Sequence, residues 1–252
     1  YPIGFSLWAS FTDWSLINQS PSFLKGANYA RLLSDTRFWN AVSNTIIYTL
    51  GVVPLGTVIS LCVAMAVNQK VRGVTIFRTI FFLPWAFLFD PDIGLLAYYL
   101  RFIGFTTQGW LRDPNYAMPA VILVSIWKNM GFNMVIFLAG LQGIPATLYE
   151  AASIDGANSW RSFWHITLPQ LRPTMTFVIV MSLISSFQVF DQVYVMTRGG
   201  PLFRTETVVQ YIYHHGFETF QMSYASTVAI SLLLIVLVLT VLQLRILDRD
   251  ID

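Results

Sequence analysis

Four long stretches of this chain contain no Asp, Glu, Lys or Arg, and they restrict its fold more than any other feature. They cover residues 38–69, 129–149, 173–190 and 219–244. A helix needs about 20 apolar residues to cross the hydrocarbon of a bilayer, and two of the stretches clearly exceed that length. Leu, Ile, Val, Phe and Ala fill them without alternation, which favours membrane helices over a membrane β-barrel.

The composition supports this interpretation and excludes other classes of protein. Of 252 residues, 55% are hydrophobic and only 11% are charged, whereas a soluble domain carries about 25% charged residues. This hydrophobicity excludes a disordered chain, and a single cysteine, Cys62, excludes a disulfide framework. The net charge of +2 gives no sign of a nucleic-acid partner. We therefore predict an all-α integral membrane protein.

We expect about six transmembrane helices in a single membrane domain over residues 1–252. Four complete spans are predicted over residues 38–67, 118–142, 169–196 and 223–247. Residues 1–11 are apolar but too short to cross a bilayer, so we expect them to be the outer end of a truncated first span.

The remaining apolar segment, between Arg78 and Asp90, is also too short for a span. Its eleven residues extend only about 16 Å as a helix. Either the helix continues through Asp90-Pro91-Asp92 with a proline kink, or residues are missing at this point. Basic residues do not fix the orientation, because seven fall on each side of the predicted membrane.

Residues 144–169 mix polar and apolar side chains and predict two short helices outside the bilayer. The first covers residues 146–154, and Gly156 stands where helices commonly end in a left-handed residue. Asn158 or Ser159 can cap the second helix. Such a pair of helices forms either a docking site for another protein or an ordinary loop between spans.

The spacing within this segment resembles the EAA loop of ATP-binding-cassette importer permeases. Glu150-Ala151-Ala152 is followed by Gly156 and, after nine more residues, by Ile166-x-Leu168-Pro169. Further motifs resemble the carbohydrate-uptake branch, the maltose-type permeases: Phe11-Thr12-Asp13-Trp14, Gly26-Ala27-Asn28-Tyr29, Phe77-Arg78 with Leu83-Pro84, Ala139-Gly140-Leu141-Gln142, and Thr197-Arg198-Gly199-Gly200-Pro201. The resemblance covers nearly the whole chain, although the family has a complete first span and a longer stretch after its Leu-Pro pair.

The resemblance implies a permease subunit of a binding-protein-dependent importer in a bacterial or archaeal plasma membrane. Two separate ATP-binding subunits would bind ATP and Mg, because this chain has no phosphate-binding loop motif. A second permease subunit, an extracytoplasmic substrate-binding protein and membrane lipid complete the implied partners. No catalytic residue, cofactor or metal site is expected in this chain itself.

The resemblance also places the EAA loop in the cytoplasm, against the ATPase. The residues expected to couple the two subunits are Glu150, Ala151, Ala152, Asp155, Gly156, Ile166, Leu168 and Pro169. A di- or oligosaccharide is the implied substrate, and a glycerophosphodiester is the open alternative.

Polar residues inside apolar spans are costly and therefore usually functional. Two sets recur at helical spacing, which places each set on one helix face. The first comprises Ser125, Lys128, Asn129 and Phe132, and the second comprises Ser182, Ser185 and Ser186, with Gln188 and Asp191 nearby. Across a central cavity they would offer hydroxyl, amide and ring contacts to a polyhydroxylated ligand. The serines equally suit close packing between transmembrane helices.

Lys128 is the basic residue predicted to lie within a span. Insertion of a lysine near the middle of a span costs about 2.5–3.5 kcal/mol, so Lys128 needs either an acidic partner or a wet cavity. Asp90, Asp92 and Asp191 are the candidate partners, and the sequence does not rank them.

Residues 197–222 predict a polar loop with several aromatic side chains. These aromatics suit contact with a substrate-delivery protein or an interfacial belt; they are Tyr211, Tyr213, Phe217 and Phe220. His214 and His215 are predicted to lie on the surface, because adjacent histidines do not share a helix face and make a poor metal site.

Two other classes of membrane protein make different demands on the sequence. An ion-coupled secondary transporter requires inverted repeats and intramembrane acidic relays. A membrane-embedded enzyme requires a cluster such as H-E-x-x-H. Neither feature is found in this sequence.

Overall fold

The computed structural model describes residues 1–15, 21–68, 98–99, 102 and 109–248. These residues are helical apart from turns, loops and one isolated β-bridge between Thr12 and Phe23. The third apolar segment, with Phe77-Arg78, Leu83-Pro84 and Asp90-Pro91-Asp92, lies outside the described residues. The total number of spans therefore stays a prediction.

Three of the described helices are long and apolar enough to cross a membrane. They are α3 (Thr36–Asn68), α7 (Ala117–Gln142) and α14 (Met222–Asp248). A fourth apolar helix, α11 (Arg172–Phe187), has 16 residues and extends only about 24 Å.

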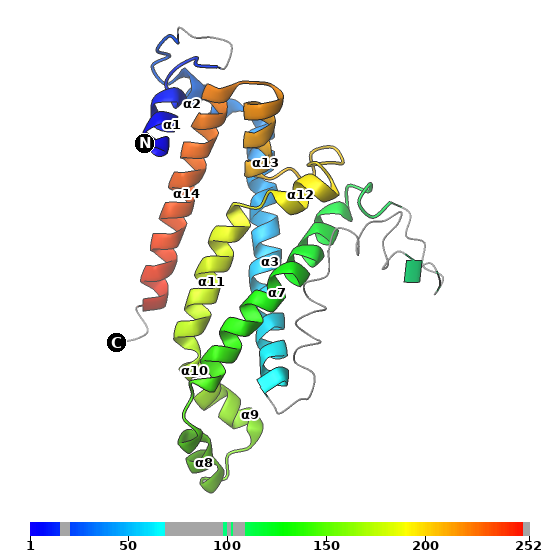
Figure 1. Cartoon of the computed structure of the whole chain (residues 1–252), viewed down its shortest axis with the longest axis vertical. Coiled ribbons are helices and arrows are strands. Elements are labelled where there is room, and N and C mark those ends of the chain that lie inside the picture. Colours follow the sequence, from blue (N-terminus) through cyan, green and yellow to red (C-terminus); the bar gives the residue numbers. More distant parts are fainter. Residues whose placement is uncertain (16–20, 69–97, 100–101, 103–108, 249–252) are drawn as a thin grey trace.

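Shorter helices cluster at the two ends of these long helices (Figure 1). The elbow (residues 144–170) contains α8 (Ala146–Ile154), α9 (Ser159–Ser162), the π-helix η1 (Phe163–Thr167) and α10 (Leu168–Gln170). The opposite end, which we call the α13 end (residues 1–15, 21–37 and 197–224), contains α1 (Pro2–Ser10), α2 (Ala27–Ser34), α13 (Val208–Tyr213) and the π-helix η2 (His214–Glu218). Between α11 and the α13 end lies α12 (Asp191–Met196).

Helix α3 is central, since it packs against both α7 and α11, while α1 runs beside α14. Three clusters of buried apolar side chains follow the length of this arrangement. The first, at the α13 end, includes Phe38, Tyr211 and Val228. The second joins α3, α7 and α12, and the third joins α3, α7 and α11 next to the elbow. The elbow is therefore attached to the packed end of the helices rather than suspended on a free loop.

The predicted spans and loops agree with the described structure except at two places. Residues 38–67, 118–142 and 223–247 are confirmed as α3, α7 and α14 to within two residues at each end. The prediction of one helix over residues 169–196 is wrong, because α11 stops at Phe187 and α12 starts only at Asp191. In this break, the Val189 carbonyl accepts a hydrogen bond from Thr207 Oγ1 at 3.0 Å.

The second correction concerns residues 197–222, which are not simply a loop. They contain α13 and η2, and both pack against α14. Hydrophobic burial stabilises these short helices, since Val208 and Tyr211 belong to the buried cluster at the α13 end.

Candidate functional site

Helix α8 of the elbow ends in a complete Schellman motif. The Gly156 N–H donates to the Ser153 carbonyl at 3.1 Å, and the Ala157 N–H donates to the Ala152 carbonyl at 2.8 Å. Gly156 has φ +74°, and this conformation strains a residue with a Cβ. A Cβ at this position would meet no atom within 4 Å. Glycine is therefore favoured at this position by the backbone conformation and not by a lack of space.

The second half of the elbow is held by two side-chain hydrogen bonds. Asn158 Oδ1 accepts from the Arg161 N–H at 2.9 Å and caps α9, which resolves the choice between Asn158 and Ser159. The hydroxyls of Tyr149 in α8 and Thr167 in η1 are 2.9 Å apart. Because this contact joins the two helical segments, the elbow has a defined internal geometry.

The surface of the elbow is nevertheless exposed. Neither α8 nor α9 contains a buried residue, and the side chains of Ile154 and Trp160 are 87% and 68% exposed. Among the predicted coupling residues, those exposed are Glu150, Ala151, Asp155, Gly156 and Pro169, and those partly buried are Ala152, Ile166 and Leu168. A cluster of exposed apolar groups of this kind is typical of a protein-binding surface.

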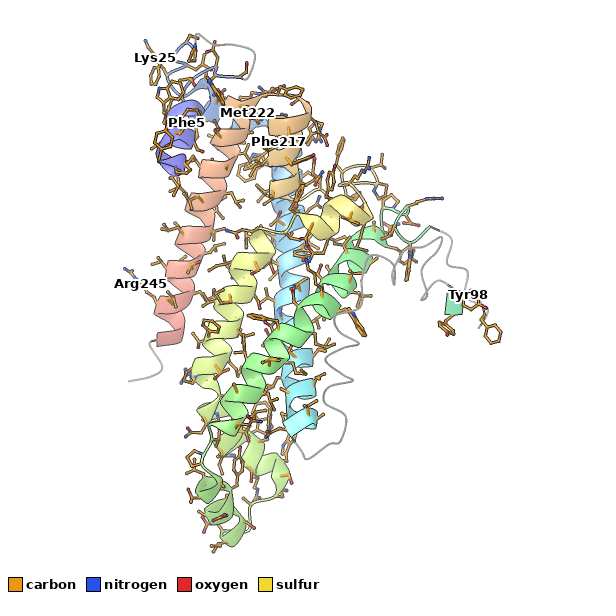
Figure 2. The ribbon with its side chains drawn as sticks, in the orientation of Figure 1. Phe5, Lys25, Tyr98, Phe217, Met222 and Arg245 are labelled. Carbon is orange, nitrogen blue, oxygen red and sulfur yellow. The ribbon has the colours of Figure 1, made fainter. Side chains whose placement is uncertain are left out.

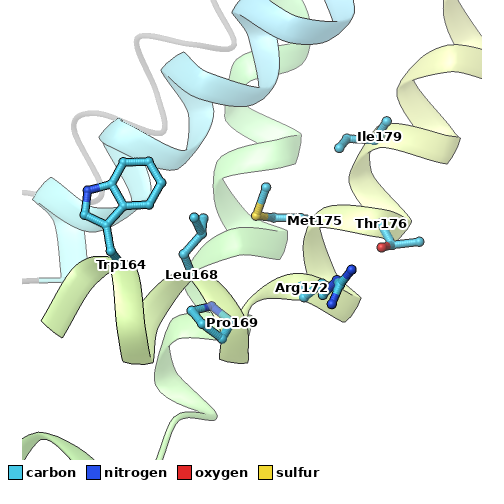
Figure 3. A pocket seen from close by; sticks show the side chains of 7 residues that line it. All are labelled: Trp164, Leu168, Pro169, Arg172, Met175, Thr176 and Ile179. Carbon is cyan, nitrogen blue, oxygen red and sulfur yellow. The ribbon is translucent and has the colours of Figure 1, made fainter. Parts of the chain in front are cut away.

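A groove of about 420 Å³ lies where the elbow meets α11 (Figure 3). Its lining is mostly apolar, with one guanidinium: Trp164, Leu168, Pro169, Arg172, Met175, Thr176 and Ile179. Helix α7 reaches the same junction at Gly140, where a Cβ would lie 2.7 Å from Thr174 Oγ1 and 2.9 Å from Leu171 Cδ2. The close approach at Gly140 therefore joins α7 directly to the beginning of α11.

The predicted polar face contains one ion pair, between Lys128 of α7 and Asp191 of α12. The two side chains are 32% and 58% exposed. Gln192 belongs to the same group: with its amide oriented to satisfy both neighbours, its oxygen accepts from Lys128 Nζ at 3.2 Å and its nitrogen donates to Asp191. Asp191 is thus a partner of Lys128, while Asp90 and Asp92 lie outside the described residues.

The remaining residues of the predicted path divide by exposure. Ser125 is buried and donates to the Val121 carbonyl at 2.8 Å, and Ser186 is buried as well. The others are partly or fully exposed: Asn129, Phe132, Ser182, Ser185 and Gln188. Asn133, which the sequence analysis missed, donates to Ser182 Oγ at 3.4 Å and connects α7 with α11. Its position four residues after Asn129, on the same helix face, is the signal that could have found it.

Two carboxylates at the α13 end, those of Glu206 and Asp35, are paired, and Glu206 is also buried. Glu206 is only 2% exposed and accepts two hydrogen bonds from the Arg37 guanidinium, at 2.7 and 2.8 Å. Asp35 accepts from the hydroxyls of Tyr211 at 2.5 Å and Tyr224 at 2.7 Å. Partial burial alone would raise the pKa of Asp35, but these hydrogen bonds outweigh it and hold the pKa below its usual value.

His215 is buried, so the prediction that both histidines lie on the surface is wrong for this residue. Its ring packs between those of Tyr211 and Tyr224, with centroid distances of 4.4 and 5.0 Å. Burial, followed by the nearby charges of His214, Arg37 and Arg31, lowers the pKa of His215 to about 4. Phe217, by contrast, is exposed at the same end of the molecule (Figure 2). Among the described residues, no group of His, Cys, Asp and Glu side chains could hold a metal ion.

Comparison with known families decides between the classes of membrane protein. The model of a family described as "binding-protein-dependent transport system inner membrane component" matches residues 30–252. This chain belongs to that family. The permease is therefore a membrane subunit of an ATP-binding-cassette importer that works with a binding protein, and the resemblance seen in the sequence is confirmed.

Curated relatives cover almost the whole permease. It is 34% identical to a probable ABC transporter permease protein of Pyrococcus horikoshii, over 94% of this chain and 86% of that one. It is also 34% identical to the sn-glycerol-3-phosphate transport system permease protein UgpA of Yersinia pestis, over 100% of this chain and 89% of the relative.

A solved structure has the same fold as the permease. It is a bacterial ABC transporter described as importing the acidic polysaccharide alginate, and the matched chain superposes with a TM-score of 0.84 at 22% identity. The match covers 100% of this permease and 90% of the other chain. The all-α membrane fold predicted from the sequence is confirmed.

Proposed function

We propose that this permease, paired with a second permease subunit, forms the path through which a di- or oligosaccharide is imported. Two separate ATP-binding subunits provide the energy, and ATP and Mg are bound there. The observation that carries the proposal is the elbow, which its own hydrogen bonds fold into a fixed shape while Ile154 and Trp160 remain exposed. A rigid, apolar surface of this kind is suited to a protein partner rather than to water.

In this mechanism the elbow lies in the cytoplasm and inserts into a groove of an ATP-binding subunit. The docking surface comprises Glu150, Ala151, Ala152, Asp155 and Gly156. Closure of the two ATP-binding subunits moves the elbow as a unit, because the Tyr149–Thr167 contact ties α8 to η1. This subunit contributes no catalytic group to ATP hydrolysis and is not itself an enzyme.

The movement reaches the membrane through two connections. Ile166, Leu168 and Pro169 lead directly into the beginning of α11. At the same junction, Gly140 brings α7 into close contact with Leu171 and Thr174. A displacement of the elbow therefore tilts α7 and α11 together, and these two helices carry most of the residues of the proposed path.

The polar residues of α7, α11 and α12 form the substrate path in this proposal. Asn129 and Ser182 offer an amide and a hydroxyl, Phe132 offers an exposed ring, and Lys128 with Asp191 offers charged groups. Ser185 and Gln188 extend this set, while the buried Ser125 and Ser186 support the packing behind it. Hydroxyl, amide and ring contacts suit a ligand rich in hydroxyl groups. The binding protein delivers this ligand at the α13 end, on the side of the membrane opposite the elbow.

A pair of variants at Gly156 tests the coupling role. Gly156→Val places a β-branched residue at a left-handed position and costs roughly 1–2 kcal/mol in the turn, so we expect about a tenfold loss of stimulated ATP hydrolysis. Gly156→Asn is the matched control, since Asn tolerates this conformation, and it should retain most of the stimulation. The readout is ATP hydrolysis by the assembled complex in nanodiscs with ligand-loaded binding protein. Equal activity of both variants and the wild type contradicts the coupling role.

The substrate class is tested by screening the same assay across ligands. We expect neutral di- and oligosaccharides to stimulate ATP hydrolysis through their binding protein. Glycerophosphodiesters are the specific alternative, and sn-glycerol-3-phosphate, which the name of a relative gives, is screened beside them. Stimulation by phosphodiesters alone would replace the saccharide with that second class and leave the importer mechanism unchanged.

A further inference from the structure

Four aromatic side chains from two separate segments form a continuous group between the break after α11 and the surface of the α13 end. Phe190 directly precedes α12, and Tyr194 lies within it. Tyr213 is the last residue of α13, and Phe217 lies in η2. The ring centroid of Tyr213 is 5.0 Å from that of Phe190 and 5.2 Å from that of Tyr194. It is 5.4 Å from that of Phe217. We call these four residues the aromatic row.

The aromatic row lies outside the packed core of the molecule. None of its rings belongs to the three clusters of buried apolar side chains that the described residues form. Phe190, Tyr194 and Tyr213 are half-buried, and Phe217 is 60% exposed. Because an aromatic ring is among the largest apolar groups that a chain can bury, a group of four rings left at the surface is suited to an external ligand.

The aromatic row is continuous with the proposed substrate path at α12. Phe190 directly precedes Asp191, and Tyr194 follows Asp191 by three residues, which places Tyr194 and Asp191 on one face of the helix. Gln188, another residue of the path, is exposed in the break just before α12. At its other end the row reaches Phe217, at the α13 end of the molecule (Figure 2). The row therefore connects the surface of the α13 end with the path.

The chemistry of the row matches the ring of a saccharide. The face of an aromatic ring carries partial negative charge, and the C–H groups on the face of a pyranose carry partial positive charge, so the two stack. The hydroxyls of Tyr194 and Tyr213 can donate or accept hydrogen bonds at the edge of the row. Arg198, whose guanidinium is 5.9 Å from the Tyr194 ring centroid, and the exposed Glu218 add further hydrogen-bonding groups. A lipid chain uses neither the ring faces nor these polar groups.

We propose that the aromatic row is a saccharide-binding track, on which pyranose rings stack as they pass from the surface of the α13 end to the substrate path. This proposal rests on the proposed function, because it takes a saccharide as the ligand and places the path at α12. It extends that function to four residues outside the path and assigns recognition there to ring faces. Since a stacked ring shifts from one aromatic face to the next without breaking a directional bond, the row holds the ligand beside the path and leaves it free to move.

The test compares two probes that differ in having a ring. Methyl β-glucoside has a pyranose ring, whereas sorbitol is an acyclic polyol without a ring face. Their dissociation constants for the assembled complex in nanodiscs are measured by saturation-transfer NMR. The binding protein is omitted so that its own affinity for the probes does not enter the result. The wild-type complex should bind the glucoside and should bind sorbitol more weakly.

Variants within the row should weaken glucoside binding. Phe217→Leu keeps an exposed apolar side chain but removes the ring, and we expect the dissociation constant to rise about threefold. Tyr194→Leu should have a similar effect at the other end of the row, and Phe217→Trp should retain binding because indole has a larger face. Phe220→Leu is the matched control, since Phe220 is 48% exposed at the same end of the molecule but is not part of the row. Its affinity should equal that of the wild type.

Several results overturn the proposal. These are no binding of the glucoside to the wild type, equally tight binding of sorbitol, an unchanged affinity in Phe217→Leu or Tyr194→Leu, or an equal loss in Phe220→Leu. Reduced thermal stability in nanodiscs with unchanged glucoside affinity assigns the rings to the membrane interface instead. Assembly with the ATP-binding subunits verifies that each variant is folded.

The proposed function is tested separately by saccharide-dependent ATP hydrolysis of the complete wild-type system. If that hydrolysis is present while the ring variants bind the glucoside as the wild type does, only the track is wrong. If the glucoside binds at the row and no saccharide stimulates hydrolysis, the proposed function is wrong and the saccharide site remains.

Discussion

At the α13 end, side chains from distant parts of the chain bond to the carboxylates of Glu206 and Asp35, whereas in the elbow every side chain except that of Thr167 is exposed or half-buried. Glu206 is paired with Arg37, and Asp35 accepts two tyrosine hydroxyls. The elbow has hydrogen bonds within its backbone and caps, but Ile154 and Trp160 remain uncovered. At the α13 end the charged side chains find their partners within the same chain. At the elbow the exposed apolar side chains are suited to contact with another protein.

The two ends therefore differ in what holds their conformation. The ion pair between the buried Glu206 and Arg37 stabilises one conformation of the α13 end, because separating the two groups leaves an uncompensated charge. The elbow is held internally, and it meets the remaining helices where α10 leads into α11 and where Ile144 packs against the third buried cluster. In the proposed mechanism, a load applied to the elbow moves it as a unit and acts first on α7 and α11.

The largest effect on stability is expected from removing the ion pair between Glu206 and Arg37 at the α13 end. Glu206→Ala leaves the Arg37 guanidinium without its bidentate partner, and we expect a loss of about 3 kcal/mol in the free energy of unfolding. Thermal unfolding of the assembled complex measures this loss. Glu218→Ala is the control, because Glu218 is exposed and contacts the His214 ring at 2.6 Å. A control as destabilising as Glu206→Ala would contradict the contrast between buried and exposed pairs.

An intermediate effect is expected from acidification, through His215. In the folded protein its pKa is about 4, below the value of about 6.5 for a free histidine. Between these two pH values the unfolded chain therefore binds more protons than the folded protein does. The contribution of His215 to the free energy of unfolding is fully present above about pH 6.5 and decreases as the pH falls toward 4.

The measurement is the thermal midpoint of the complex at pH 7.5 and pH 5. The midpoint of the wild type should be lower at pH 5 than at pH 7.5. We expect this difference to be smaller in His215→Phe, because Phe fills the space between Tyr211 and Tyr224 without a titrating group. His214→Gln is the matched control and should retain the decrease. An equal pH dependence in His215→Phe and the wild type would show that other groups dominate.

The smallest effect on stability is expected at the elbow. Ile154→Ser replaces an exposed side chain and should change the free energy of unfolding by less than about 0.5 kcal/mol. Because that side chain is expected to be buried by an ATP-binding subunit, the same change should weaken subunit binding about tenfold. Leu202→Ser, at the similarly exposed Leu202 of the α13 end, should leave subunit binding unchanged. If both variants weaken binding equally, the two ends do not differ in the way described.

Much of the elbow could be predicted because its signals are local. The range 146–154, the left-handed Gly156 and a capping residue at Asn158 all depend on contacts between residues close in sequence. The long apolar spans were predictable for the same reason, since length and lack of charge alone define them. The break after Phe187 was missed, because the apolar pattern continues through Val189 while the Val189 carbonyl bonds to the distant Thr207.

The sequence by itself determined a helical membrane protein with a folded elbow, because hydrophobicity, periodicity and caps act over a few residues. Its motifs indicated a permease by resemblance to a known family. Only the tertiary structure decided that Lys128 pairs with Asp191, 63 residues away, and that His215 is buried while His214 is not. It also decided that Glu206 and Arg37 meet at the α13 end. These pairings depend on how α3, α7, α12 and α13 pack, and a single charge in a sequence does not specify which of several opposite charges will lie beside it.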